Sequence, residues 1–185
     1  MSDRTEPLSD AENELLIVRC QLGEPAAFVE LIQQWSGRLL HHLQRTAGQD
    51  MAEDLAQEVW IRALRGIPRL RDGAKLRAWL FGIAHHVAID RLRHRYAETA
   101  MLAAVADVPA AEPDADAETR SLLLNAELAR LPLVEREALT LFYLEGLSLA
   151  ELADVQAVPI GTAKSRLFRA RQMLRDSMTK GDQDA

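Results

Sequence analysis

The chain has 185 residues, a formal net charge of −6 and 48% hydrophobic residues, enough for one ordinary domain or two small ones. Its single cysteine, Cys20, excludes an internal disulfide, and we expect its thiol to be a small packed side chain. No apolar run approaches the roughly 20 residues that span a bilayer. The segment MSDRTEPLSD is acidic where a signal peptide would be basic and then apolar, so we expect a soluble cytoplasmic protein.

The first half of the chain predicts four helices. Apolar residues recur at spacings of three and four, and no run alternates like a strand, so the expected fold is all-α. Ser9 and Asp10 are possible caps of the first helix, and Pro25 suits the first turn of the second. The expected helices span residues 9–23, 24–48, 50–66 and 74–96, and the Pro and Gly of IPRLRDG predict a loop between the last two.

Charge is sorted along the chain and divides it into parts. Residues 62–95 hold nine basic and two acidic residues, whereas residues 97–118 hold six acidic residues and no basic one. The acidic segment is rich in Ala and Pro, which predicts a flexible linker; a solvated spacer without a specific role is the alternative. Two small helical domains are therefore expected, at residues 11–96 and 119–178, joined by this linker at residues 97–118.

The second domain contains the pattern of a helix-turn-helix. A helix is expected to end at Gly146, and Ser148 with Glu151 three residues later forms a capping box that starts the next one. The break AVPIG then leads into a basic segment, Val158–Leu174. Two short helices joined by a tight turn commonly place the second helix in the major groove of DNA.

The basic segment has one apolar face and one polar face. Its apolar residues fall at offsets 0, 4, 7 and 11, a single buried stripe of Ala163, Leu167, Ala170 and Leu174. Arg and Lys can pair with guanine edges, Gln with adenine, and further positive charge can hold phosphates. The residues expected to contact DNA are Thr162, Lys164, Ser165, Arg166, Phe168 and Arg169, with Gln172 on the same face. A solvated basic face on a core helix is the alternative.

Three segments resemble the extracytoplasmic-function (ECF) sigma factors, the initiation subunits of bacterial RNA polymerase. The block LPLVEREALTLFYLEGLSLAELADVQAVPIGTAKSRLFRARQML resembles their region four, and its hexad GTAKSR at residues 161–166 is close to the family's most characteristic run. The segment DVQAVP departs from the family, which more often has an apolar pair and a glycine there. AEDLAQEVWIRAL and LRAWLFGIAHHVAIDRLRHR resemble the polymerase-binding and promoter-melting helices of region two.

The resemblance implies a role for each helix. The helix at 52–64 has an acidic, partly apolar face that suits a basic helical partner, and an ordinary solvated face is the alternative. The implied partner is the clamp of the largest polymerase subunit, contacted through Asp54, Gln57, Glu58 and Ile61. The flap of the second subunit, promoter DNA and an anti-sigma factor are the other implied partners.

The next helix and the loop before it combine positive charge with aromatic rings, as sites for single-stranded DNA do. The resemblance implies that they capture and read the −10 element through Arg69, Arg71, Lys75, Arg77, Trp79, Phe81, Arg91 and Arg93. A core position is the alternative for both aromatic residues, and for Trp79 it is the favoured one.

Neither catalysis nor a metal is expected. His41–His42 and His85–His86 are adjacent pairs whose side chains point about 100° apart on a helix, so neither resembles an i, i+4 metal pair. The sequence indicates no catalytic residue, cofactor or small-molecule substrate. A sigma factor is thus the first interpretation, and a free-standing helix-turn-helix regulator is the second. The first domain favours the sigma factor, because a regulator has no need of both a clamp-binding face and a basic aromatic helix.

Overall fold

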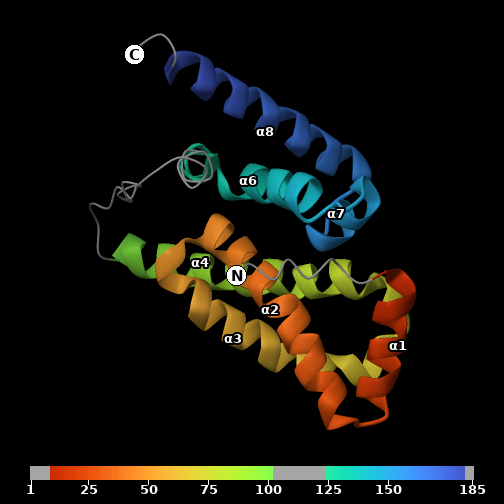
Figure 1. Cartoon of the computed structure of the whole chain (residues 1–185). Helices are drawn as coiled ribbons and strands as arrows, with labels where there is room; N and C mark the ends of the chain where they lie inside the picture. Colours follow the sequence, from red (N-terminus) through yellow and green to blue (C-terminus); the bar gives the residue numbers. More distant parts are fainter. Residues whose placement is uncertain (1–8, 102–123, 182–185) are drawn as a thin grey trace, which may run out of the picture. The chain divides into compact units, whose positions relative to one another are not determined.

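The computed structural model of the chain describes residues 9–101 and 124–181 (Figure 1). Every regular element in these two ranges is helical, as the sequence predicts. The chain divides into two compact units, Met1–Gln44 with Gly48–Ala88, and Arg45–Ala47 with Ile89–Ala185. No helix in the described parts is long and apolar enough to cross a membrane.

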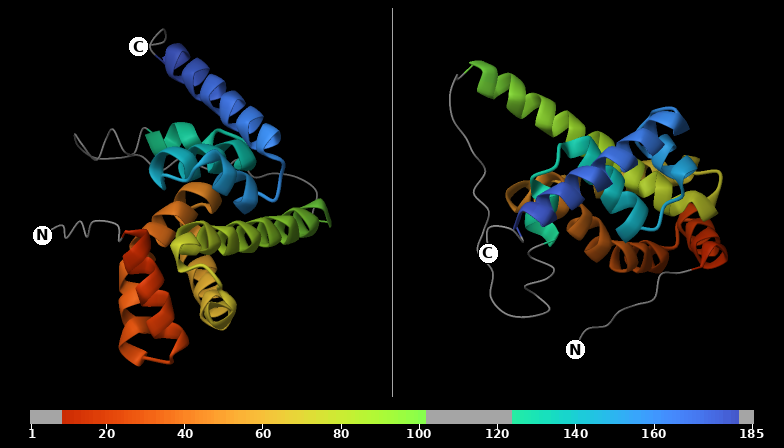
Figure 2. Two further views of the ribbon diagram at one scale, coloured as in Figure 1. Left: turned by 90° about the vertical axis from the view of Figure 1, so that its right-hand side faces the viewer. Right: turned by 90° about the horizontal axis from the view of Figure 1, so that it is seen from above.

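The first four helices confirm the sequence prediction closely. They are α1 (Asp10–Gln21), α2 (Pro25–Ala47), α3 (Gln49–Gly66) and α4 (Leu76–Met101), and short 3₁₀ turns, η1 (Ile67–Arg69) and η2 (Gly73–Lys75), occupy the expected loop. Ser9 caps α1 in a capping box with Glu12, with Ser9 N to Glu12 Oε2 at 2.8 Å. One long helix, α4, begins later than expected and continues past Tyr96, where the sequence placed its end (Figure 2).

The core of the first unit is formed by apolar faces of all four helices. Fully buried side chains include Leu16 and Ile17 of α1, Leu31 and Leu39 of α2, Leu55 and Val59 of α3, and Leu76, Leu80 and Phe81 of α4. Burial of a residue of this size contributes about 1.5–3 kcal/mol relative to exposure. These contacts fix which sides of α3 and α4 face outward.

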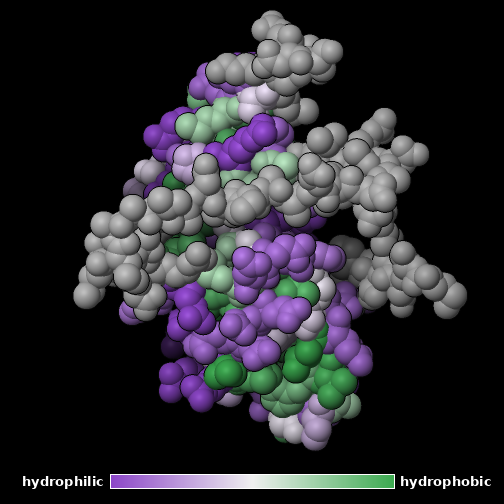
Figure 3. Space-filling view, turned by 90° about the vertical axis from the view of Figure 1, so that its left-hand side faces the viewer, coloured by the Kyte–Doolittle hydropathy of each residue, from purple (hydrophilic) through white to green (hydrophobic). Residues whose placement is uncertain are grey.

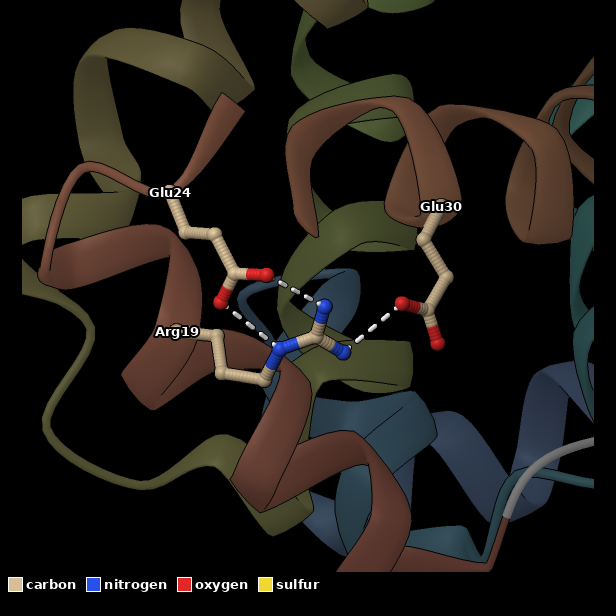
Figure 4. A network of polar contacts seen from close by, with 3 residues as sticks. All are labelled: Arg19, Glu24 and Glu30. Carbon is tan, nitrogen blue, oxygen red and sulfur yellow. Dashed lines mark hydrogen bonds and ion pairs between the residues drawn. The ribbon is translucent and has the colours of Figure 1, made fainter. Parts of the chain in front are cut away.

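A polar network closes the turn between α1 and α2 (Figure 4). The Arg19 guanidinium donates to both carboxylate oxygens of Glu24, at 2.9 and 2.8 Å, and to Glu30 Oε2 at 2.7 Å. Hydrogen bonds to Glu24 and Glu30 raise the pKa of Arg19, and those from Arg19 lower the pKa of Glu24. Because a bidentate Arg–carboxylate pair is geometrically specific, this network fixes the position of the start of α2 relative to the end of α1.

Hydrophobic residues gather on the surface toward the end of the first unit where α1 turns into α2 (Figure 3). The exposed large hydrophobic residues of these two helices are Leu15, Val18, Leu22 and Val29. The first three are spaced by three and four, so they lie along one side of α1, opposite its buried residues.

The second unit contains α6 (Leu133–Leu139), a π-helical turn η3 (Thr140–Leu144), α7 (Leu149–Val155) and α8 (Ile160–Gly181). Figure 1 shows α8 lying across α6 and α7. Their core holds Leu128, Leu131, Leu139, Leu167 and Ala170, with Phe142, Leu149 and Leu174 packed against it. The capping box of α7 is formed as predicted, with Ser148 N to Glu151 Oε2 at 2.8 Å.

The turn between α7 and α8 is built without the usual glycine. Val158 N donates to Ala153 O at 3.0 Å and Ala157 N to Asp154 O at 3.1 Å, the bond pair that commonly closes a helix with a left-handed residue. Ala157 occupies the left-handed position with φ 50°, the one non-glycine residue with positive φ in the described chain. A tight helix-turn-helix therefore forms although the sequence departs from the family here.

Candidate nucleic-acid interface

The basic face of α8 is exposed because the opposite face is buried. Ala163 and Ala170 are 0% exposed, Leu167 is 5% exposed, and Leu174 packs half-buried against the same core, which confirms the predicted stripe. Lys164, Ser165, Phe168 and Arg169 are accordingly exposed, with Phe168 at 52%, whereas Thr162 and Arg166 are half-buried at the edge of this face. Ser165 and Arg169 thus lie opposite the buried stripe, with Lys164 and Arg166 on its two flanks, and the DNA contacts of the six residues stay a prediction.

Two of these arginines are held by residues of the supporting elements. Arg169 Nη2 lies 3.1 Å from Glu135 Oε1, and the Glu135 side chain, at the start of α6, is only 8% exposed. Arg166 Nη1 donates to Gln156 Oε1 at 3.0 Å. Both guanidinium groups are therefore held by partners within the second unit.

Ser165 has a second role within the helix. Its Oγ donates to Gly161 O at 2.9 Å, so the hydroxyl hydrogen is used and only acceptor capacity faces outward. In a DNA contact Ser165 would therefore accept a hydrogen bond unless this internal bond breaks.

Sequence reasoning missed Glu135, Glu137 and Gln156, which hold Arg169 and Arg166 directly or through one another. All three are buried, at 6%, 2% and 4% exposure. Gln156 could have been noticed in the sequence, because it is a polar residue within DVQAVP, where the family more often has an apolar pair. The two glutamates carry no such signal, since Glu is common on any helix.

The basic loop of the first unit is fastened to α1. Gln21 Nε2 donates to Ile67 O at 3.0 Å and to Leu70 O at 2.8 Å. A Cβ on Gly73 would lie 2.6 Å from Glu14 Cα, so only glycine allows this close approach. Asp72 caps η2 by accepting from Ala74 N at 3.1 Å. The loop is a defined surface rather than a loose connection.

The predicted −10 residues lie on this loop and on α4. Arg69, Arg71 and Lys75 are exposed and Arg77 is half-buried, with Lys75 Nζ 3.7 Å from Asp72 Oδ2. Arg91 and Arg93 are exposed farther along α4. Positive charge is therefore exposed on the loop and along α4.

The two aromatic residues differ in access. Phe81 is 0% exposed and packs edge-on against Trp35 and His42, with ring centroids 6.4 and 4.9 Å apart. The prediction that Phe81 contacts DNA is wrong, because a ring enclosed on all sides offers no face to a base. Trp79 is half-buried and packs on the Gly66 backbone, where an added Cβ would lie 2.7 Å from Trp79 Cζ2.

The acidic face of α3 is displayed as a patch. Asp54, Gln57 and Ile61 are exposed, Ile61 at 45%, and Glu58 is half-buried. Glu58 Oε1 accepts from Arg62 Nε at 2.7 Å, an i, i+4 pair that neutralises part of the patch. Asp54 therefore carries the more available negative charge.

Comparisons with known proteins cover both units. Two family models match, Sigma-70 region 2 over residues 31–98 and Sigma-70, region 4 over residues 121–174. The ECF RNA polymerase sigma-E factor of Haemophilus influenzae is 32% identical over 187 residues, covering 94% of this chain and 97% of that protein. The ECF RNA polymerase sigma factor SigC of Mycobacterium tuberculosis is 35% identical over 150 residues, 80% of each chain.

A solved structure is similar as well. The sigma factor RpoE from Bartonella quintana, in a co-crystal with the anti-sigma factor NepR, matches with a TM-score of 0.66 at 27% identity. The match covers 82% of this chain and 96% of that chain.

Proposed function

Because this chain belongs to the ECF sigma factors of bacterial RNA polymerase, we propose that its two units divide promoter recognition between them. The chain directs RNA polymerase to promoters for initiation. The observation that carries the division of labour is that region 2 and region 4 lie on one chain in order, each with its own basic surface. The domains would be residues 11–96 and 119–178; most of the joining segment, 97–118, lies outside the described residues.

The α3 patch binds core polymerase in this proposal. Asp54, Gln57, Glu58 and Ile61 combine negative charge with an exposed apolar side chain, which suits a basic helical partner such as the clamp of the largest subunit. Region 4 would in turn contact the flap of the second subunit.

The loop and α4 hold the opened −10 strand. Arg69, Arg71, Lys75, Arg91 and Arg93 supply positive charge for the phosphates, and half-buried Trp79 has ring surface on which a base can stack. Since the loop is fastened to α1 through Gln21, it presents this charge at a fixed place. The duplex −35 element lies against α8, whose exposed Lys164, Phe168 and Arg169 enter the major groove.

Further partners follow from the relatives. RpoE from Bartonella quintana was solved with an anti-sigma factor, and we propose a protein of that class as the regulator of this chain. We place the chain in the cytoplasm with polymerase, and we assign it no catalytic step, because polymerase supplies the chemistry of RNA synthesis.

Reconstitution with core polymerase tests the proposal. The full chain added to core enzyme should give transcripts that start at specific promoters, and neither component alone should do so. A chain that bound promoter duplex tightly by itself but supported no transcription with core enzyme would instead be a free-standing helix-turn-helix regulator.

A further inference from the structure

The second unit contains a buried polar chain that ends at the DNA-facing side of α8. Glu137 of α6 is 2% exposed and Gln156, at the end of α7, is 4% exposed. Gln156 Nε2 donates to Glu137 Oε2 at 3.0 Å and to Val134 O at 3.1 Å. Gln156 Oε1 accepts from Arg166 Nη1 at 3.0 Å. One amide therefore joins α6, the end of α7 and α8.

The chemistry of these partners requires an amide at position 156. Glu137 and the Val134 carbonyl both accept hydrogen bonds, so the NH₂ group must face them, and the amide oxygen must then face the Arg166 donor. A glutamate at this place would set two carboxylates against each other, and an apolar residue would bond neither neighbour. The orientation of Gln156 is thus determined by its partners.

Arg166 has donors left for a ligand. A guanidinium carries five N–H groups, and Gln156 engages Nη1. No second partner for this guanidinium is found among the residues that the structure describes. Arg166 sits half-buried at the edge of the basic face, so its remaining donors are held on the side of α8 that it shares with Thr162 and Arg169, four residues before it and three after it.

We propose that Gln156 is a positioning residue for promoter recognition, which orients Arg166 toward DNA by bridging it to the buried Glu137 carboxylate. This inference rests on the proposed function of α8. It also gives a reason for the departure DVQAVP, because the polar residue in an apolar position sets the direction of an arginine that reads the −35 element.

A double-mutant cycle on the reconstituted holoenzyme tests this. Promoter affinity is measured by fluorescence anisotropy on a fragment with an intact −35 element and on one with that element scrambled. Gln156→Leu should weaken binding to the intact element by about three- to tenfold, the size expected for one side chain that must be ordered on binding. In an Arg166→Ala background the same change should have little further effect, because the residue it orients is gone.

A charge exchange separates positioning from folding. Glu137→Gln with Gln156→Glu keeps one donor and one carboxylate between the two positions and again offers an acceptor to Arg166. This double variant should recover a large part of the promoter affinity that Gln156→Glu alone loses, although no donor then faces Val134 O. Thermal melting of each variant checks the fold.

The outcomes are distinct. If Gln156→Leu weakens binding equally with and without Arg166, or if Arg166→Ala weakens binding and Gln156→Leu does not, the positioning role is overturned. Unchanged affinity for Arg166→Ala alone, with losses for Lys164→Ala and Arg169→Ala, also overturns it. If Lys164→Ala, Arg166→Ala and Arg169→Ala each change the affinity for the intact and the scrambled element equally, the proposed function of α8 fails instead.

Discussion

Ala157 holds a backbone conformation that L-residues with a Cβ seldom adopt. At φ 50° its Cβ is crowded by the backbone, at a cost of roughly 1–2 kcal/mol that glycine avoids. The bonds from Ala157 N and Val158 N to the end of α7 keep it there. The turn thus stores a small strain in the element that aims α8.

Ala157→Gly should therefore stabilise the protein by about 1 kcal/mol, measured by urea unfolding. Gly23→Ala is the matched control: Gly23 has φ 79°, and a Cβ there would meet nothing within 4 Å, so the change tests backbone conformation alone. It should destabilise by a similar amount. A glycine variant no more stable than the unmodified chain would show that the turn is unstrained.

Cys20 is a packed core residue. It is 2% exposed, and burial raises the pKa of its thiol. A raised pKa lowers the thiolate fraction at neutral pH, so reaction with a disulfide reagent should be at least about tenfold slower in the native chain than in urea. The native rate should increase as pH rises. Equal rates in both states would mean that the thiol is accessible and suited to redox sensing.

At the scale of elements, α3 carries Asp54 and Glu58 on the face that we propose binds core polymerase. Asp54→Lys with Glu58→Lys should abolish association with core polymerase in gel filtration, because both charges reverse on the proposed binding patch. The cost in stability should be under about 0.5 kcal/mol, typical of surface changes, as circular dichroism would show. Glu14→Lys on α1 changes an exposed acid outside the patch and should leave co-elution intact. Co-elution of the α3 variant would exclude this face.

The recognition helix separates base reading from phosphate binding. Arg169→Ala should reduce −35 discrimination by roughly 1–3 kcal/mol at one base pair if Arg169 contacts a guanine edge. Arg171→Ala removes the same charge from another side of α8 and should cause only a small loss on all sequences. Binding of a panel of single-base promoter variants measures both. An equal loss over all bases for Arg169→Ala would indicate phosphate binding, and Lys164→Ala tests its neighbour in the same way.

At the scale of the whole molecule, positive surfaces lie within a chain of net charge −6. Six acidic residues and no basic one occupy residues 97–118, between the two basic parts in sequence. A specificity subunit that occupied promoters without polymerase would block them. Acidic residues that oppose the basic surfaces in the free chain would prevent this.

Neutralising Glu112, Asp114, Asp116 and Glu118 should therefore increase DNA binding by the free chain. These four residues lie outside the described part of the chain, and the expectation follows from their charge alone. The increase should be largest at low salt, where the screening length is long. Fluorescence anisotropy on a promoter fragment at two salt concentrations measures it. Unchanged affinity at both would leave the segment as a spacer.

The sequence by itself determined the helices and the outward side of α8. Caps such as Ser9 and Ser148, and stops such as Gly23 and Gly146, act over a few residues, so local rules predict them. The stripe from Ala163 to Leu174 likewise follows from helix geometry alone. Local interactions suffice because each is completed within one or two turns of chain.

Only the tertiary structure decided which side chains are enclosed and which are held. Trp79 and Phe81 are two residues apart on α4, so their side chains point about 200° apart, and the apolar pattern of α4 did not show which of them is buried. Packing against Trp35 and His42 buries Phe81. Glu135 meets Arg169 across more than thirty positions of sequence, and Glu137 joins Arg166 through Gln156. Such contacts depend on how α6, α7 and α8 pack, because side chains distant in sequence meet only when the helices carrying them share a core.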